Sequence, residues 1–301
     1  MQEYYFANYR VMMDASVAAR ESARYFAAFT APMPYTHTFR VRDGEGKDAN
    51  ERRAWALGCP EVWNNGVFTV HDTGEGWAFI ITPKAEQTTM HWVHNLALCS
   101  RDYRDITVYA AGGESGCGAS EAFGGKRLRD VLLFAVNIGI YLNDGLTLHA
   151  SMVEKDGLGV IFLGPCGIGK STQAKLWEAC LGANCLCDDR LCLRRIDGRW
   201  VGFGLPWNVG ETLHQDSVPV GALVRLKKAK ESRIEPINLL QTMAELLSQP
   251  MLPAWDEAAM DTVTAQMAAL AQEEPSFRLY CLPDEAAARL TYETILKMAS
   301  P

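Results

Sequence analysis

The segment GPCGIGKS, residues 164–171, constrains the fold of this chain more than any other. It follows the β-prone run Val160 to Leu163 and precedes a helix-compatible run, Ser171 to Cys180. Its glycines permit a tight turn, because glycine adopts backbone angles that other residues rarely do. A strand, a glycine-rich turn and a helix in direct succession predict an α/β fold for this part of the chain.

The same segment has the spacing G-x-x-x-x-G-K-[ST], which is typical of loops that bind nucleotide phosphates. Backbone N–H groups in such a loop, together with the start of the following helix, face the phosphate oxygens. We expect Lys170 to reach the β- and γ-phosphates and the Ser171 hydroxyl to ligate Mg²⁺. The residues predicted to bind the nucleotide are Gly164, Pro165, Cys166, Gly167, Ile168, Gly169, Lys170, Ser171 and, with less support, Thr172.

Two adjacent carboxylates, Asp188 and Asp189, follow the β-compatible residues Cys185 and Leu186. Paired acids are usually solvated loop charges, but after a phosphate loop they favour metal and acceptor chemistry. Arg190 is either a phosphate contact or the ion-pair partner of these acids. His149 lies at the edge of the β-prone run before the loop, where the residues alone favour a hydrogen-bonded core histidine.

Composition narrows the class of protein. A formal net charge of −7 argues against a surface that binds nucleic acid. The N-terminus lacks a secretory signal pattern, and no apolar run approaches the roughly 20 residues that cross a bilayer, so we expect a cytoplasmic protein without a membrane span. Nine cysteines then suggest reduced thiols rather than a disulfide framework.

The chain is long enough for two domains. Residues 1–123 predict a smaller, mostly β (α+β) domain, with a clear hairpin where Asp72 to Gly76 separates two β-prone runs. The glycine-rich segment 110–125 predicts a boundary, the alternative being a surface loop inside one domain. Residues 124–301 then form the phosphate-loop domain, beginning with a helix over 126–144. The N-terminal domain is a candidate docking module for a substrate or partner.

Three motifs together resemble a known family. LHAS, GVIFLGPCGIGKST and CDDR look like the C-terminal catalytic domain of HPr serine kinase/phosphorylase, within the group related to phosphoenolpyruvate carboxykinase. GFGLPWNVGE, PVGALVRLKK and SFRLYCLPDEAAARL extend the resemblance to an uncharacterised HPr-kinase-like branch, over residues 126–301. HPr kinases carry a different glycine-rich signature where this chain has GFGLPW, so the resemblance does not extend to HPr recognition or to the reverse phosphorylase reaction.

The resemblance implies a P-loop kinase domain and a role for each polar residue. It implies Asp188 as the general base toward an acceptor hydroxyl, Asp189 as a contact to the metal, and His149 as support, although the two Asp roles could be exchanged. The predicted function is a Mg-ATP-dependent kinase that phosphorylates a hydroxyl, with serine favoured, of a peptide, protein or small metabolite. The alternative is a nucleotide-binding regulatory or partner-recruiting protein without phosphotransfer. The sequence does not decide between ATP and GTP as the nucleotide, or between a monomer and a homo-oligomer.

Weaker features receive structural interpretations. Residues 202–207 with Glu211 are read equally well as a flap over the site or as a loop whose Trp207 packs in the core. Arg225 stands out within an apolar strand. Four cysteines lack the spacing of zinc knuckles and are read as buried thiols: Cys180, Cys185, Cys187 and Cys192.

Overall fold

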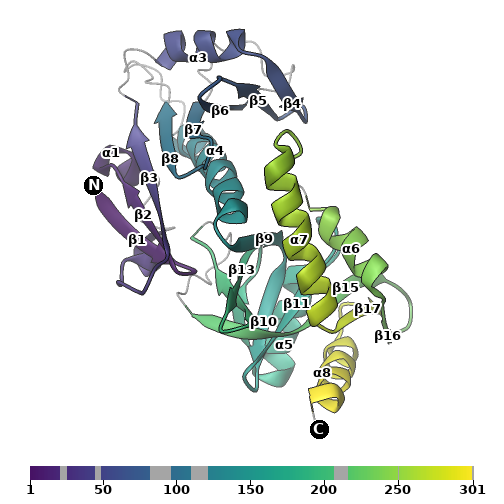
Figure 1. The fold of residues 1–301 in the computed structure, drawn as a ribbon. Coiled ribbons are helices and arrows are strands. Elements are labelled where there is room, and N and C mark those ends of the chain that lie inside the picture. The colour runs from purple at the N-terminus through teal and green to yellow at the C-terminus, as the bar shows by residue number, and fades with distance from the viewer. Residues whose placement is uncertain are drawn as a thin grey trace. The chain divides into compact units, whose positions relative to one another are not determined.

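A computed structural model describes residues 1–20, 26–44, 49–81, 96–109, 121–206, 216–249 and 251–299. It is a mixed α/β protein with two β-sheets and several helices (Figure 1). The contacts divide it into two compact units. Unit 1 comprises Met1–Asn143 with Pro253–Met260, and unit 2 comprises Asp144–Leu252 with Asp261–Pro301.

Unit 1 is built on an eight-stranded sheet in the order β1-β2-β3-β8-β7-β6-β5-β4. The pairs β2–β3 and β3–β8 are parallel and the others antiparallel. The predicted hairpin is confirmed as β5 and β6, with Gly74 at a φ of 82° and its N–H donating to Asp72 Oδ1 at 2.8 Å. The strands are β1 (Gln2–Phe6), β2 (Tyr9–Met13), β3 (His37–Asp43), β4 (Glu61–Asn64), β5 (Phe68–Asp72), β6 (Gly76–Ile81), β7 (Leu96–Ser100) and β8 (Asp105–Tyr109).

The helices of unit 1 are α1 (Ala15–Arg20), the short 3₁₀ helix η1 (Ala27–Phe29), α3 (Ala49–Gly58) and α4 (Glu121–Leu142). The helix predicted over 126–144 is therefore confirmed as α4. It packs against β6, β7 and β8, with Phe134 stacked on Phe68 and edge-on to Phe79. Because of this packing the division by contacts falls after α4, whereas the predicted boundary at 123–124 falls within it. Most of the glycine-rich boundary segment, 110–120, lies outside the described residues.

Unit 2 contains the second sheet, of nine strands. Seven follow the order β12-β10-β11-β15-β14-β13-β9, while β17 pairs with β15 and β16 with β17. The long strand β15 pairs antiparallel with β14 near its start, then parallel with β11 and β17. The strands are β9 (Gly145–His149), β10 (Ser151–Lys155), β11 (Leu158–Leu163), β12 (Asn184–Cys187), β13 (Arg190–Ile196), β14 (Arg199–Gly204), β15 (Ser217–Lys228), β16 (Arg233–Pro236) and β17 (Ser276–Cys281).

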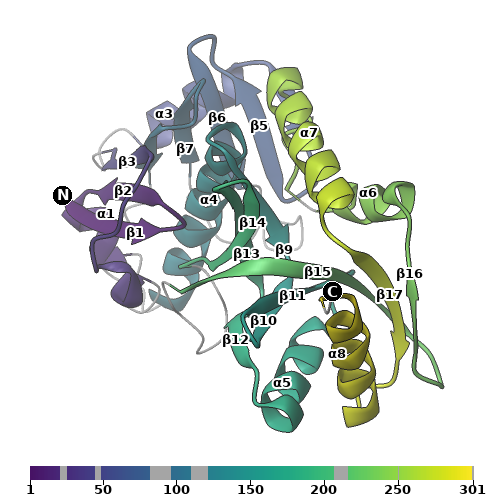
Figure 2. The ribbon, with the colours of Figure 1, turned by 60° about the horizontal axis from the view of Figure 1, so that its bottom comes forward.

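Helices α5 (Lys170–Leu181) and α8 (Glu285–Ala299) pack against each other in unit 2 (Figure 2). Trp177 of α5 is fully buried in the core between them, edge-on to Phe162 of β11 and to Tyr292 of α8. The other helices are α6 (Leu239–Leu247) and α7 (Glu257–Glu273), whose first residues are assigned to unit 1.

Helices α6 and α8 each begin after a residue whose side chain caps the helix. Asn238 caps α6 through a reciprocal capping box with Gln241. Asp284, the residue before α8, accepts a hydrogen bond from the backbone N–H of Ala287 at 3.0 Å.

Candidate functional site

The glycine loop, residues 164–169, leaves the end of β11 and enters α5, so the predicted strand–loop–helix order is confirmed. Three of its glycines have positive φ angles: 139° at Gly164, 75° at Gly167 and 118° at Gly169. A Cβ atom added at Gly167 or Gly169 would meet no atom within 4 Å. The space on the Cβ side of both glycines is therefore open, and Gly169 forms the N-cap of α5 without a side chain over the helix end.

Lys170 is the first residue of α5 and is only 5% exposed. Its Nζ donates hydrogen bonds to the carbonyl oxygens of Gly164 at 3.0 Å and Pro165 at 3.4 Å. Burial lowers the pKa of Lys170, while the nearby Cys166 and Asp189 oppose that shift. The ammonium group is thus folded back against the loop, where anionic oxygens could replace the two carbonyls.

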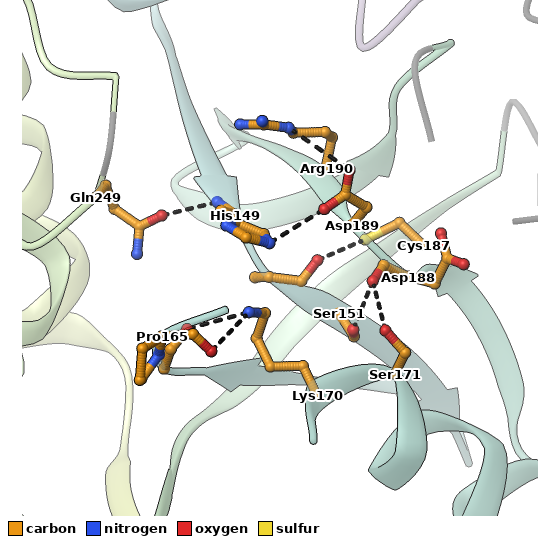
Figure 3. A network of polar contacts seen from close by, with 12 residues as sticks. His149, Ser151, Pro165, Lys170, Ser171, Cys187, Asp188, Asp189, Arg190 and Gln249 are labelled. Carbon is orange, nitrogen blue, oxygen red and sulfur yellow. Dashed lines mark hydrogen bonds and ion pairs between the residues drawn. The ribbon is translucent and has the colours of Figure 1, made fainter. Parts of the chain in front are cut away.

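Asp188 and Asp189 lie in the bend between β12 and β13, as predicted (Figure 3). Two serine hydroxyls donate to the same backbone carbonyl of Asp188: Ser171 Oγ of α5 at 3.2 Å and Ser151 Oγ of β10 at 2.9 Å. The carboxylate oxygen Oδ1 of Asp188 is buried and has no hydrogen-bond partner among the described residues. The glycine loop and the acid pair are therefore joined through Ser171, and one acidic oxygen is left available for a ligand.

His149 ends β9 and lies opposite Arg190 of the neighbouring strand β13. Its Nε2 is 3.1 Å from Asp189 Oδ1, so the structure brings the predicted histidine to the acid pair (Figure 3). Arg190 Nε lies 3.8 Å from the other oxygen of Asp189, which makes Arg190 an ion-pair partner in this state.

The pKa of Asp189 reflects opposing influences. Burial raises it, but the hydrogen bond from His149 and the charges of Arg190 and Lys170 bring the pKa of Asp189 below its ordinary value. The carboxylate is thus held in its charged form, as suits a group that faces cations.

Two contacts at the site were not predicted from the sequence. Ser151 lies within the LHAS motif, which predicts no role for it. Gln249, which follows α6, accepts a hydrogen bond from the backbone N–H of His149 at 2.7 Å. The β-prone run over these residues also divides at Ala150, whose N–H donates to Asp189 O at 3.2 Å. The division places His149 and Ser151 in different strands, both beside the acid pair.

The remaining residues predicted to bind nucleotide surround this centre. Pro165, Cys166 and Thr172 are exposed, and Ile168 packs partly into the core. Arg225 of β15 lies opposite Leu163, next to the loop, and forms an ion pair with Glu245 of α6. The flap residues Trp207 and Glu211 lie outside the described residues.

The cysteines proposed as buried thiols can be placed. Cys185, Cys187 and Cys192 are buried, and burial raises the pKa of Cys187 and Cys192, the latter to about 12. Cys180 is partly exposed. Among the described residues, no group of three or more His, Cys, Asp or Glu side chains is arranged to hold a metal ion.

The site nevertheless offers oxygen atoms suited to Mg²⁺, which prefers hard oxygen ligands and retains several waters and phosphate contacts. The Ser171 hydroxyl gives its proton to Asp188 O, which leaves its own lone pairs available. This hydroxyl and the charged carboxylate of Asp189 fit a cation that also contacts a bound phosphate.

One hollow lies elsewhere in unit 2. It has a volume of about 940 Å³ and is lined by residues that include Glu154, Glu178 and Asp216. These residues belong to the far end of the β10–β11 hairpin, the body of α5 and the start of β15. None of the predicted site residues lines it.

Comparison with known proteins finds similarity to one protein family and to solved structures. A protein family described as SynChlorMet cassette protein ScmC matches residues 129–273, just under half of the chain, and this range includes the glycine loop and the acid pair. Among solved structures, the Hpr(Ser) kinase/phosphatase from Coxiella burnetii is 17% identical, with 51% of this chain and 92% of that chain covered at a TM-score of 0.32. Among curated proteins, none matches. In the described part of the chain, every helix is too short or too polar to cross a membrane.

Proposed function

We propose that this protein is a Mg-ATP-dependent kinase of the HPr kinase type, which transfers the γ-phosphate to a hydroxyl group. The observation that carries the proposal is the hydrogen bond of 3.2 Å between Ser171 and Asp188. It joins an open glycine turn at a helix N-terminus to a pair of acids. The site therefore has a place for phosphate beside a group that can accept a proton, the two requirements of phosphoryl transfer.

The glycine loop and Lys170 bind the phosphates in this proposal. The positive φ angles of Gly167 and Gly169 leave the backbone N–H groups free of side-chain cover at the start of α5, where the helix dipole favours anions. Lys170 exchanges its bonds to Gly164 and Pro165 for bonds to phosphate oxygens. Each such charge-assisted bond contributes about 1.5–3 kcal/mol.

Asp188 acts as the general base in this proposal, and Asp189 with His149 holds the charge beside it. Asp188 has an unpartnered Oδ1 within the described structure, so it can accept the proton of an acceptor hydroxyl. Asp189 is a weaker base than an ordinary carboxylate, because the hydrogen bond from His149 and the charges of Arg190 and Lys170 outweigh burial and lower its pKa. Mg²⁺, when bound by Ser171 and Asp189, neutralises charge on the phosphates.

The acceptor in this proposal is a serine-type hydroxyl on a peptide, protein or small metabolite. The proposed location is the cytoplasm, where ATP is available and the free thiols of this chain stay reduced.

Transfer of label from γ-phosphate-labelled ATP tests the proposal. Wild type, Asp188→Asn and Lys170→Ala are incubated with Mg²⁺ and either a host-cell extract or free serine, and nucleotide affinity is measured separately. We expect wild type to label a discrete acceptor, Lys170→Ala to bind nucleotide at least ten-fold more weakly, and Asp188→Asn to bind normally but lose transfer.

The matched control is Asp197→Asn. Asp197 is exposed in the turn between β13 and β14 at a φ of 50°, which asparagine also tolerates. This variant should behave as wild type. Normal ATP binding without any labelled acceptor would refute the kinase and favour a nucleotide-binding regulatory protein. Equal transfer by wild type and Asp188→Asn would refute the assignment of the base, and loss only in Asp189→Asn would exchange the two roles.

A further inference from the structure

Strand β4 forms one edge of the sheet in unit 1. It pairs with β5 on one side, and no described strand pairs with its other side. The register shifts between Glu61 and Trp63, so Val62 is the extra residue of a bulge. Three of the four residues are exposed, Trp63 being the exception. An edge of this kind presents unpaired N–H and C=O groups that an extended chain can satisfy.

Apolar side chains surround this edge. The helix α3 leads directly into β4 (Figure 1), and the junction is fixed by the hydrogen bond from Asp72 N–H to Pro60 O at 2.9 Å. The exposed apolar residues are Trp55 and Leu57 in the last turn of α3, Val62 in β4 and Val67 after it, each between 39% and 45% exposed. Surface apolar residues are ordinary when scattered, but Trp55, Leu57 and Val62 lie on either side of the α3–β4 junction, with Val67 beyond the other end of β4.

A cationic side chain, Arg53, lies in the same helix. The Nε atom of Arg53 is buried and has no hydrogen-bond partner among the described residues, and burial lowers the pKa of Arg53. Arg53 and Leu57 are one turn apart on the same side of α3.

We propose that the β4 edge and the end of α3 bind an extended segment of a partner polypeptide, which adds a strand to β4, places apolar side chains against Trp55, Leu57 and Val62, and directs an Asp or Glu to Arg53. Main-chain hydrogen bonds supply the attraction in this mode of binding, and the alternate side chains supply the specificity.

A second copy of the chain fits this edge less well. Two four-residue strands would bury far less than the roughly 1,200 Å² of a stable interface. The bulge at Val62 also prevents a long, flat pairing of identical edges. A short peptide does not need such an area, because weak binding suffices for a transient partner.

The test selects peptides on the full-length protein in the absence of nucleotide. A phage library of random dodecapeptides is panned on wild type, and the enriched sequences are synthesised with a fluorophore for anisotropy titrations. We expect sequences that alternate apolar residues around an Asp or Glu. Binding should weaken at least five-fold in Val62→Asp and in Arg53→Gln, and Arg53→Gln should also remove the preference for the acidic residue.

Two controls separate this surface from the rest of the molecule. Leu240→Asp changes a leucine of α6 that is 78% exposed, and Lys170→Ala changes the proposed phosphate site; both should bind the peptides as wild type does. If Val62→Asp loses its thermal unfolding transition, Leu57→Asp replaces it.

The proposal is overturned if no peptide is enriched, or if the enriched peptides bind Val62→Asp and wild type equally. It is also overturned if wild type is a dimer that Val62→Asp dissociates, since the second copy would then occupy the edge. Because nucleotide is absent, each of these results is independent of whether the protein transfers phosphate.

Discussion

Two glycines of unit 2 allow the role of the glycine loop to be separated from its contribution to stability. Gly167 in the loop has a φ of 75°, and Gly182, which ends α5, has a φ of 62°. At neither position would an added Cβ meet an atom within 4 Å. Alanine at either position therefore costs only the unfavourable left-handed backbone conformation, about 1–2 kcal/mol. For a domain of this size that lowers the melting temperature by roughly 2–4 °C per kcal/mol.

The two variants should differ only when nucleotide is added. At a ligand concentration 100 times Kd, binding stabilises a native protein by about 2.7 kcal/mol. Gly182→Ala should keep this nucleotide-dependent rise in melting temperature in full. Gly167→Ala should lose most of it, because its methyl group enters the space where phosphate oxygens would approach the backbone N–H groups.

The assay is thermal unfolding with and without Mg-ATP, followed by calorimetric titration for Kd. The reasoning is refuted if Gly167→Ala binds Mg-ATP with the affinity of Gly182→Ala, since the loop would then be a structural turn alone.

Three further variants, at two positions, test the energetics of unit 2. Glu274 is partly buried beside Glu273, and burial followed by that neighbouring charge raises the pKa of Glu274 to about 7. The native state therefore favours the protonated form of Glu274. The stability that this preference contributes is fully present below the pKa that Glu274 has in the unfolded chain, and it is lost as the pH rises through 7. Glu274→Gln should raise the melting temperature at pH 8, by the equivalent of about 1 kcal/mol after solvent screening. At pH 4 it should leave the melting temperature unchanged. An equal rise at both pH values would contradict this prediction. Trp177→Ala should cost about 3–5 kcal/mol in chemical denaturation. Trp177→Phe should lower the free energy of unfolding much less, because the buried indole N–H has no hydrogen-bond partner among the described residues. Equal losses of stability in Trp177→Ala and Trp177→Phe would show that ring volume is not the main contribution of Trp177.

The sequence alone identifies those parts of the site that are determined by residues adjacent in the chain. Glycines at positive φ, a β-branched run before them and a helix-compatible run after them specify the loop without help from distant residues. The same holds for Asp188 and Asp189, which follow a short apolar strand and fall in the bend beyond it. The chemical roles of these residues stay predictions.

Other features depend on which strands pair, and a single run of residues does not determine pairing. LTLHASMV is uniformly β-prone, yet β9 pairs with β13 while β10 pairs with β11 and β12, so the strand divides at Ala150. Gln249 reaches His149 across a hundred residues of sequence, and only the position of α6 brings it there. Residues 253–260 belong to unit 1, where two of them contact the hydroxyl of Tyr103. Trp255 Nε1 donates a hydrogen bond to this hydroxyl, and Asp256 Oδ2 accepts one from it.

The carbonyl of Asp188 accepts hydrogen bonds from two hydroxyls, that of Ser151 at the start of β10 and that of Ser171 in α5, the helix that follows the glycine loop. A carbonyl oxygen has two lone pairs, and here both are used. If the Ser171 hydroxyl rotates toward a ligand, Ser151 still anchors the peptide group. The acid pair is therefore preorganised: the entropy of fixing its backbone is lost when the chain folds, and a substrate that arrives later does not have to order it again.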